Sequence, residues 1–316
     1  MQALKKIVRK IYTLIFTKSG RNKAVRLVRL FQLKKFSNYK NNLPVCYKLL
    51  DGNRFVVHQN DYLSLEIYLQ REYEHLESRV VKSLLYQDDV VIDIGANVGY
   101  YTALLSQIVG VNGKVYAFEP GEITFQKLQQ TLKCLELNNV EIFPIGIGEY
   151  NQTVPFFTSN SGHDAQQSIN EWIGMDLVGG KYEKNTIDLL SIDSFCEDKK
   201  IETQNISFIK CDVEGFEKAV LLGSQSLLKS ENPPIWQVEI NWLALEKNKT
   251  NPQEIIDLLD GYSMYYTPLS FYTKDKEKNL RRVPVNINEL PKICNLFAFP
   301  MIGLYSQRSQ ILNLIE

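Results

Sequence analysis

The sequence predicts a doubly wound α/β fold with a parallel sheet, and three observations support that prediction. The first is an apolar, β-branched run at residues 90–94, typical of a buried strand, followed by glycines at 95 and 99. The second is the regular alternation of such strands with helical patterns from residue 89 onward. The third is Glu119, a carboxylate at the end of the next strand, about twenty residues beyond the first turn. In doubly wound folds this position binds a ribose diol.

The turn after residues 90–94 has the features of a ligand-binding turn. Gly95 and Gly99 allow a positive φ and leave no Cβ to block a ligand, and the helix expected over 100–108 presents free N–H groups there. Asp93 is a charge inside an apolar strand, so it either caps the turn or faces a cationic ligand. The spacing Asp-x-Gly-x-x-x-Gly lacks the first glycine of the dinucleotide fingerprint, which counts against a nicotinamide-dependent oxidoreductase. The alternative is an α/β domain in which Glu119 merely enters a helix.

Composition indicates a globular chain in a reducing compartment. The 316 residues are 44% hydrophobic and 23% charged, with a net charge of zero. Five scattered cysteines without a Cys-x-x-Cys pair predict reduced thiols and a cytoplasmic location. Three histidines argue against a His-rich metal centre. No apolar run has the length of a membrane span, and Arg9 and Lys10 interrupt the first apolar segment, which argues against a signal peptide.

Residues 1–40 form a basic amphipathic segment, because they hold twelve Lys or Arg and no Asp or Glu. One interpretation is a peripheral helix held by anionic lipid. Another is an anionic polymer, although no nucleic-acid module is recognisable and nucleic acid is not expected. The third is a helix that packs on its own core or on a second subunit, giving a homo-oligomer.

Residues 41–86 are expected to cover the ligand site. Strands at 45–49 and 54–58 form a hairpin through the turn at 51–53, and a helix follows over about 63–85. Tyr73 and Glu74 either hold the ligand from above or are ordinary half-buried residues, and the second interpretation is favoured.

Residues 87–316 form the main α/β domain, with an insertion at about 150–205. Within the insertion, residues 159–168 are polar and rich in turn formers, and we expect them near the mouth of the ligand site. The expected strands are 90–94, 114–118, 140–145, 153–158, 186–192, 206–211, 235–240, 262–267 and 295–300, and the expected helices are 100–108, 123–137, 217–228 and about 252–259.

Four signatures stand in order along the chain: VIDIGANVGYYT at 91–102, AFEP at 117–120, IKCDVEGFE at 209–217 and NLFAFP at 295–300. With SIDSF at 191–195, this set resembles the FkbM family of S-adenosylmethionine-dependent methyltransferases over about 87–300. Cys211 departs from the family, which more often has an aliphatic residue there. The resemblance implies a class I fold, with a seven-stranded, mostly parallel sheet and helices on both faces. It also implies a hydroxyl acceptor, often on a sugar or secondary metabolite.

The resemblance implies roles for named residues. S-adenosylmethionine is expected at Asp93, Gly95, Asn97, Gly99, Tyr101, Thr102, Glu119, Pro120, Gly146, Ile147 and Asp212. Asp212, at the end of the strand that faces the transferred methyl group, is the first candidate for the base of the acceptor, followed by Glu214 and Glu239, and then by His163. No metal is expected, although Asp212, Glu239 and Asn241 offer an oxygen-ligand set.

Three functions remain open at this point. The favoured one is an S-adenosylmethionine-dependent O-methyltransferase acting on a glycan or glycolipid hydroxyl. The others are an NAD-dependent oxidoreductase and a non-catalytic binding module on the same scaffold.

Overall fold

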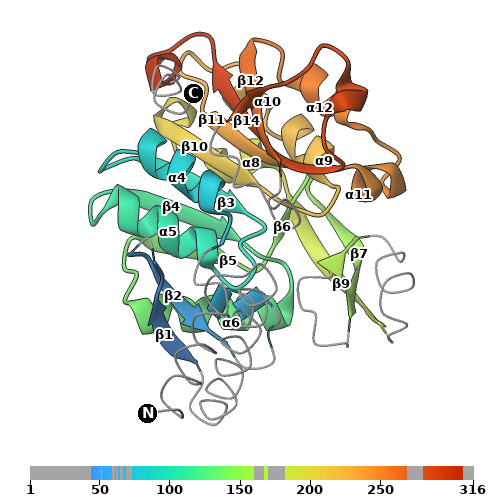
Figure 1. The fold of residues 1–316 in the computed structure, drawn as a ribbon. Coiled ribbons are helices and arrows are strands. Elements are labelled where there is room, and N and C mark those ends of the chain that lie inside the picture. Colours follow the sequence, from blue (N-terminus) through green and yellow to red (C-terminus); the bar gives the residue numbers. More distant parts are fainter. Residues whose placement is uncertain are drawn as a thin grey trace, which may run out of the picture.

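A computed structural model describes residues 44–50, 52–58, 61, 63–64, 67–68, 73–159, 167–169, 182–268 and 280–308. The basic segment 1–40 and His163 lie outside these residues. Within them, an eight-stranded sheet runs through the molecule in the order β13-β12-β14-β11-β10-β3-β4-β5 (Figure 1). Its strands are β3 (Val90–Ile94), β4 (Lys114–Phe118), β5 (Val140–Phe143), β10 (Ile206–Cys211), β11 (Ile235–Asn241), β12 (Tyr262–Pro268), β13 (Arg281–Arg282) and β14 (Ile293–Pro300).

The sheet confirms the predicted doubly wound architecture. From β3 the chain adds β4 and β5 on one side, then returns to add β10 and β11 on the other, all parallel. Strand β14 is antiparallel to both of its neighbours, β11 and β12. Seven strands were expected, and the two-residue β13 is the eighth in the described residues. Apart from β13, which pairs antiparallel with β12 at the edge, the sheet has parallel strands and one reversed strand, β14, which is the class I arrangement.

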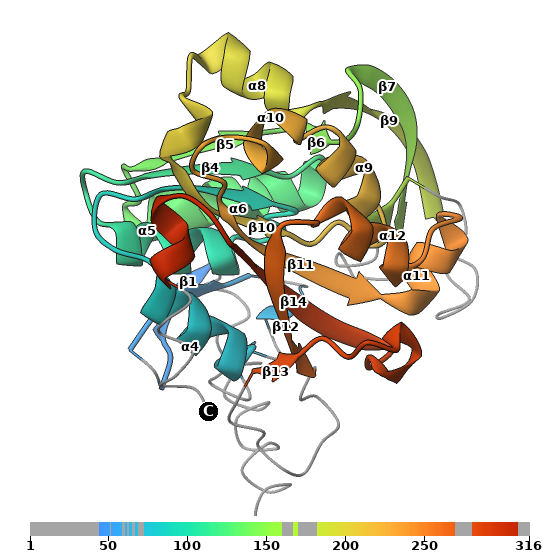
Figure 2. The same cartoon turned by 90° about the horizontal axis from the view of Figure 1, so that it is seen from above.

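Helices cover both faces of the sheet, because successive strand residues point to opposite sides. Val91 and Phe208 pack on the face covered by α4 (His75–Leu84), α5 (Tyr100–Val109) and α6 (Glu122–Leu135). Ile92 and Ile209 pack on the other face. Figure 2 shows α4 and α5 on one side of the sheet and the helices after residue 190 on the other. These are α8 (Ile192–Lys199), α9 (Glu217–Leu222), α10 (Gln225–Leu228), α11 (Trp242–Lys247) and α12 (Pro252–Leu258), with short 3₁₀ turns η2 (Thr203–Asn205) and η3 (Ile287–Glu289).

The N-terminal hairpin forms as expected but lies beside the helices. Strands β1 (Val45–Lys48) and β2 (Arg54–Val57) pair antiparallel, and Arg54 Nη2 donates to the carbonyl of Leu135 in α6 at 3.0 Å. Residues 63–64 and 67–68 are helical, but α4 itself starts at His75. The predicted continuous helix is therefore wrong at Glu74, whose φ of 42° is left-handed.

The insertion folds into a second sheet in the order β6-β9-β7-β8. Its strands are β6 (Gly146–Ile147), β7 (Gln152–Ser159), β8 (Gln167–Ser168) and β9 (Tyr182–Leu190). The antiparallel pair β7 and β9 extends from the body of the molecule (Figure 1). Near its base, Phe156, Ile187 and Leu189 form one small apolar cluster.

Three helical assignments differ from the sequence expectations. Helices α8 and α11 were not predicted. The helix expected over 217–228 is divided into α9 and α10 at Gly223. A Cβ at Gly223 would lie 2.1 Å from the carbonyl oxygen of Gly148. This close approach of the two backbones requires glycine at the position where the helix is divided.

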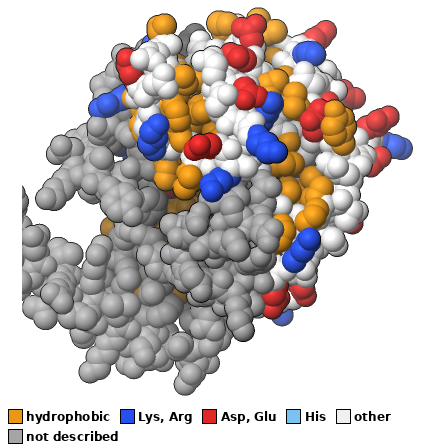
Figure 3. Space-filling view, turned by 90° about the vertical axis from the view of Figure 1, so that its right-hand side faces the viewer, with side chains coloured by type: hydrophobic (Ala, Val, Ile, Leu, Met, Phe, Trp, Pro, Cys, Tyr) orange, Lys and Arg blue, Asp and Glu red, His pale blue; other side chains and the backbone are white. Residues whose placement is uncertain are grey.

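Among the described residues, no helix combines the length and the apolarity that crossing a bilayer requires. Figure 3 shows Lys and Arg side chains interspersed with Asp and Glu side chains on the described part of one face. On that face, charge of both signs is mixed with hydrophobic side chains.

Candidate active site

A cavity of about 220 Å³ opens at the carboxyl ends of β3, β4, β10 and β11. The strand order reverses between β3 and β10, so the cavity lies at the topological switch point, where open α/β sheets bind ligands. Its lining combines turn residues, carboxylates and an apolar wall: Leu63, Tyr73, Glu74, Ile94–Val98, Tyr100, Tyr101, Phe118–Pro120, Thr124, Gly146, Ile147, Phe156, Ile169, Ile187, Leu189, Lys210, Asp212–Glu214, Phe216 and Glu239.

Asp93 holds the base of the first turn from inside the sheet. It is fully buried, and its Oδ2 accepts a hydrogen bond from the hydroxyl of Thr102 in α5 at 2.6 Å. Burial raises the pKa of Asp93, while Lys210 and Thr102 act in the opposite direction. Asp93 and Thr102 are absent from the cavity wall. They therefore position the turn rather than line the cavity.

The turn itself requires glycine and a left-handed asparagine. Gly95 has a φ of 80°, and a Cβ there would lie 1.9 Å from the carbonyl oxygen of Asp212. Gly99 has a φ of 90° and packs against Leu128. Asn97, with a φ of 51°, has a buried Oδ1 without a partner among the described residues. Such an orphaned acceptor on the cavity wall suits a ligand that donates a hydrogen bond.

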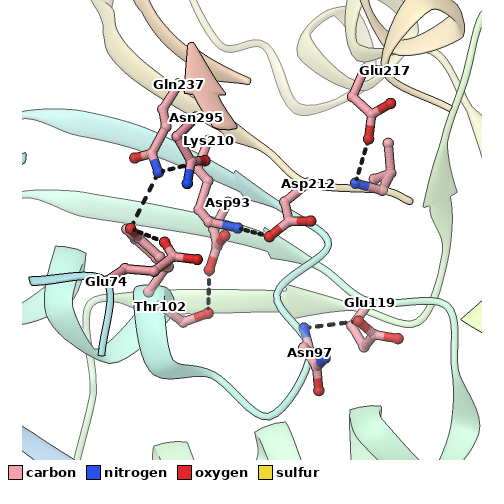
Figure 4. A network of polar contacts seen from close by, with 12 residues as sticks. Glu74, Asp93, Asn97, Thr102, Glu119, Lys210, Asp212, Glu217, Gln237 and Asn295 are labelled. Carbon is pink, nitrogen blue, oxygen red and sulfur yellow. Dashed lines mark hydrogen bonds and ion pairs between the residues drawn. The ribbon is translucent and has the colours of Figure 1, made fainter. Parts of the chain in front are cut away.

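Glu119 ties the end of β4 to this turn. Its Oε1 accepts from the Gly121 N–H and the Thr124 hydroxyl at 2.8 and 2.7 Å, and its Oε2 accepts from the Asn97 N–H at 2.8 Å (Figure 4). Burial raises the pKa of Glu119, and these three donors lower it. A carboxylate has about four acceptor sites. Glu119 is therefore held rigidly at the cavity, with about one acceptor site left for a ligand hydroxyl.

A buried ion pair closes the cavity at the end of β10. Lys210 Nζ lies 2.8 Å from Asp212 Oδ2 and 4.7 Å from the centre of the Tyr101 ring (Figure 4). Burial lowers the pKa of Lys210, but Asp212, Asp93 and Glu74 outweigh it, so the net shift is upward. The lysine is thus charged and already paired.

Three further carboxylates share the cavity. Burial, followed by repulsion from Asp212 and Glu217, raises the pKa of Glu214 to about 8. Burial and neighbouring carboxylates also raise the pKa of Glu239 well above its ordinary value, and its Oε2 has no partner among the described residues. Glu74, the third, comes from the turn before α4. The lining thus carries far more potential negative charge than Lys210 balances.

The structure brings most of the predicted site residues together. Gly95, Asn97, Tyr101, Glu119, Pro120, Gly146, Ile147, Asp212, Glu214 and Glu239 all line the cavity. Gly99, Asp93 and Thr102 lie behind the wall. Asn241 is engaged elsewhere, because its Oδ1 caps α11 at the Ala244 N–H. The described residues contain no cluster of three or more His, Cys, Asp or Glu side chains that could hold a metal ion.

Sequence reasoning gave no role to Lys210 of the cavity wall and did not favour a ligand-binding role for Glu74. Lys210 had a usable signal, because it is a charge inside an apolar strand, as Asp93 is. For Glu74, a role in holding the ligand was considered, but an ordinary half-buried position was favoured. It is half-buried and also lines the cavity.

Residues 93–296 match the profile of the Methyltransferase FkbM domain. The hexuronic acid methyltransferase AglP of Haloferax volcanii is 27% identical over 159 residues, 49% of this chain and 59% of that protein. The protein-L-isoaspartate O-methyltransferase of Methanococcus aeolicus is 32% identical over 101 residues, 31% of this chain and 45% of that protein. The chain thus spans about half the length of the curated relatives it matches.

Among solved structures, the chain is similar to a methyltransferase FkbM from Methylobacillus flagellatus KT, with a TM-score of 0.42 and 18% identity over 74% of this chain and 52% of that one. It is also similar to a SAM-dependent O-methyltransferase from Thermotoga maritima, with a TM-score of 0.41 and 14% identity over 81% of this chain and 77% of that one.

Proposed function

The chain belongs to the FkbM family of S-adenosylmethionine-dependent methyltransferases, and from that premise we propose that it methylates a hydroxyl oxygen of a sugar, glycolipid or secondary metabolite. The observation that carries the proposal is the cavity at the switch point. There the Gly95–Asn97 turn and the rigid Glu119 carboxylate meet the carboxylates at the ends of β10 and β11.

The lining fits the methyl donor. Glu119 retains about one acceptor site for a ribose hydroxyl, and Asn97 Oδ1 is a buried acceptor without a partner among the described residues. Pro120, Gly146 and Ile147 would border the adenine, and Gly95 with Tyr101 would flank the methionine end. When bound, the donor supplies an electrophilic methyl group on a positively charged sulfur.

The work left to the protein is alignment and proton removal. Holding two reactants in line contributes roughly 7–11 kcal/mol to lowering a barrier. A positioned base adds about 10²–10⁴-fold. We assign the base to Asp212, whose side chain is 26% exposed and faces the cavity while Lys210 fixes one of its oxygens. Glu214 and Glu239 follow, and His163 remains a candidate outside the described residues.

A sugar acceptor is supported by the sequence similarity to the hexuronic acid methyltransferase. The cavity also has an aromatic wall, formed by Tyr73, Tyr101, Phe156 and Phe216, on which a sugar ring can pack.

The proposal is tested by incubating the full chain with S-adenosylmethionine and a panel of neutral sugars, amino sugars, uronic acids and glycolipids. Release of S-adenosylhomocysteine together with a new O-methyl signal in the acceptor is the expected result. Methylation of nitrogen or carbon acceptors alone would overturn the assignment to oxygen. Asp212→Ala is expected to lose turnover when it is assayed under conditions in which the variant is saturated with donor. Donor binding with no turnover on any acceptor would favour the binding-module alternative.

We also propose that the basic residues 1–40 bind the cytoplasmic surface of a membrane. Their twelve cationic side chains and apolar stripe suit anionic lipid, and the five free thiols suit a reducing compartment. Vesicles containing anionic phosphatidylserine are expected to pull down the full chain but not a variant lacking residues 1–36. Equal recovery of the two proteins would refute the membrane contact.

A further inference from the structure

Glu74 is a carboxylate that the segment before the family domain contributes to the cavity. It immediately precedes α4, whereas the family match starts at residue 93. Figure 4 shows its side chain linked through a tyrosine hydroxyl to Gln237, and the charges of Lys210 and Asp212 act on its carboxylate. The segment thus adds a carboxylate to those at the ends of the strands.

The backbone at Glu74 is unusual and firmly held. Its φ of 42° and ψ of 58° are left-handed, a conformation that is costly for any residue with a side chain. The preceding carbonyl, of Tyr73, accepts hydrogen bonds from the Tyr100 hydroxyl at 3.1 Å and the Ser78 hydroxyl at 3.2 Å. Both donors belong to helices, so two elements fix the turn that aims Glu74.

The carboxylate of Glu74 is oriented by two tyrosines. The Tyr101 hydroxyl donates to Oε2 at 2.6 Å, and the Tyr73 hydroxyl also hydrogen-bonds to the carboxylate. Gln237 Nε2 in turn donates to the Tyr101 oxygen at 3.2 Å. Since a carboxylate has about four acceptor sites, Glu74 is both fixed and able to accept more.

The charge around Glu74 is unbalanced. Lys210 is the neighbouring cation, and its ammonium is bonded to Asp212. Burial, followed by repulsion from Glu77 and then Asp212, raises the pKa of Glu74 to about 8, while Lys210 and Tyr101 oppose the shift. Glu239 and Tyr73 face the same group from β11 and the turn. A second cation at this place would stabilise the ionised carboxylate.

We propose that Glu74 binds the α-ammonium group of the methyl donor's methionine portion. The inference rests on the proposed function, because it requires the donor in this cavity. An ammonium supplies N–H donors to the carboxylate, whereas a sulfonium supplies none, so a hydrogen-bonding carboxylate matches the amino acid end of the donor. Glu74 is a donor-binding residue in this assignment, and the segment before the family domain completes the donor site.

The test compares three ligands on the isosteric variant Glu74→Gln by titration calorimetry. S-adenosylmethionine and S-adenosylhomocysteine both carry the ammonium, and 5′-methylthioadenosine lacks the whole amino acid end. Loss of a charge-assisted hydrogen bond is expected to weaken the first two by about tenfold or more, in similar proportion, and to leave the third unchanged. Glu136→Gln is the matched control, because Glu136 is also left-handed, with a φ of 56°, but is exposed at the end of α6.

The outcomes separate this inference from its premise. If the unmodified chain binds none of the three ligands, the donor site itself is refuted. If it binds them and Glu74→Gln binds them equally well, only the role of Glu74 is refuted. Weaker binding of S-adenosylmethionine alone would place Glu74 at the sulfonium and also overturn the inference. The unliganded variant is expected to melt no lower than the parent, since it removes a half-buried carboxylate whose ionised form is disfavoured there. A lower melting temperature with uniform loss of all three ligands would indicate a structural role.

Discussion

At the scale of single residues, Gly95 is the position with the least freedom in the site. A Cβ there would overlap the Asp212 carbonyl, and the φ of 80° is strained for alanine. We expect Gly95→Ala to lower the free energy of unfolding by about 3 kcal/mol or more. Gly261→Ala is the control, because Gly261 has a φ of 88° and open space around it. Equal costs for the two variants in urea titrations would show that the contact with β10 is unimportant.

Glu119 is the residue whose charge the donor site depends on most directly. Glutamine would present an N–H group or lose an acceptor where Glu119 now receives three donors. Glu119→Gln is therefore expected to weaken S-adenosylmethionine binding at least tenfold, as for the loss of about 1.5 kcal/mol from a charged hydrogen bond. Glu122→Gln, three residues on and exposed, should bind the donor normally. An unchanged dissociation constant for Glu119→Gln would remove Glu119 from the site.

Some residues of this site were open to prediction from sequence and others were not. Asp93, Gly95 and Glu119 break the local pattern, since each is a charge or a glycine beside an apolar strand. Glu74 breaks no pattern, because a glutamate before a helix is ordinary and its left-handed φ depends on contacts from Tyr100 and Ser78. Asn241 was named only as part of an oxygen-ligand set for a metal that was not expected. Its oxygen instead caps α11, a helix that was not predicted.

At the scale of elements, an arginine ties the segment after β14 to the start of β3 and the end of α4. Arg308 makes a two-pronged ion pair with Asp89, at 2.6 and 2.8 Å, and donates to the Leu84 carbonyl at the end of α4. Both side chains of the pair are largely buried, at 12% and 10% exposure. Arg308→Ala is expected to cost about 3 kcal/mol, because it leaves Asp89 without its partner. The exposed Arg79 of α4 is the control, and thermal unfolding is the measurement.

The strands were predicted better than the helices, for a physical reason. Buried parallel strands are continuous apolar runs, and β3, β4 and β10 match their predicted bounds. Helix α8 is only eight residues long and opens at Ser191, whose hydroxyl accepts from the Ser194 N–H, a signal that the strand-like Leu189 and Leu190 outweighed. The division at Gly223 depends on the backbone of Gly148, a contact between distant parts of the chain.

At the scale of the whole molecule, the buried carboxylates make stability depend on pH. The pKa values of Glu74 and Glu214 are about 8, and that of Glu217 is about 7, against ordinary values of 4.5. Between pH 6.5 and 8 the folded chain thus holds protons that the unfolded chain has released, so the free energy of unfolding falls as pH rises. His58, with a pKa lowered to about 4 from 6.5, acts in the opposite sense, mainly below pH 6.5 and less and less as the pH rises through the window.

The measurement is the melting temperature of the unliganded chain across the same interval. We expect a decrease toward pH 8, and a smaller decrease in the double variant Glu74→Gln with Glu214→Gln. A melting temperature that is constant or rises with pH would contradict the upward shifts on which the expectation rests.

Asp93 and Lys210 occupy directly paired positions on the two central strands, β3 and β10. Each is buried, at 0% and 3% exposure, and each favours the charged form of the other. Replacing Lys210 alone leaves Asp93 without a neighbouring cation in the middle of the sheet, whereas replacing both with apolar residues removes that cost and leaves only Asp212, which is 26% exposed, without its partner. Relatives that have lost this lysine are therefore expected to have lost Asp93 as well, even where the donor-binding turn is retained, whereas loss of Asp93 alone leaves the lysine paired with Asp212.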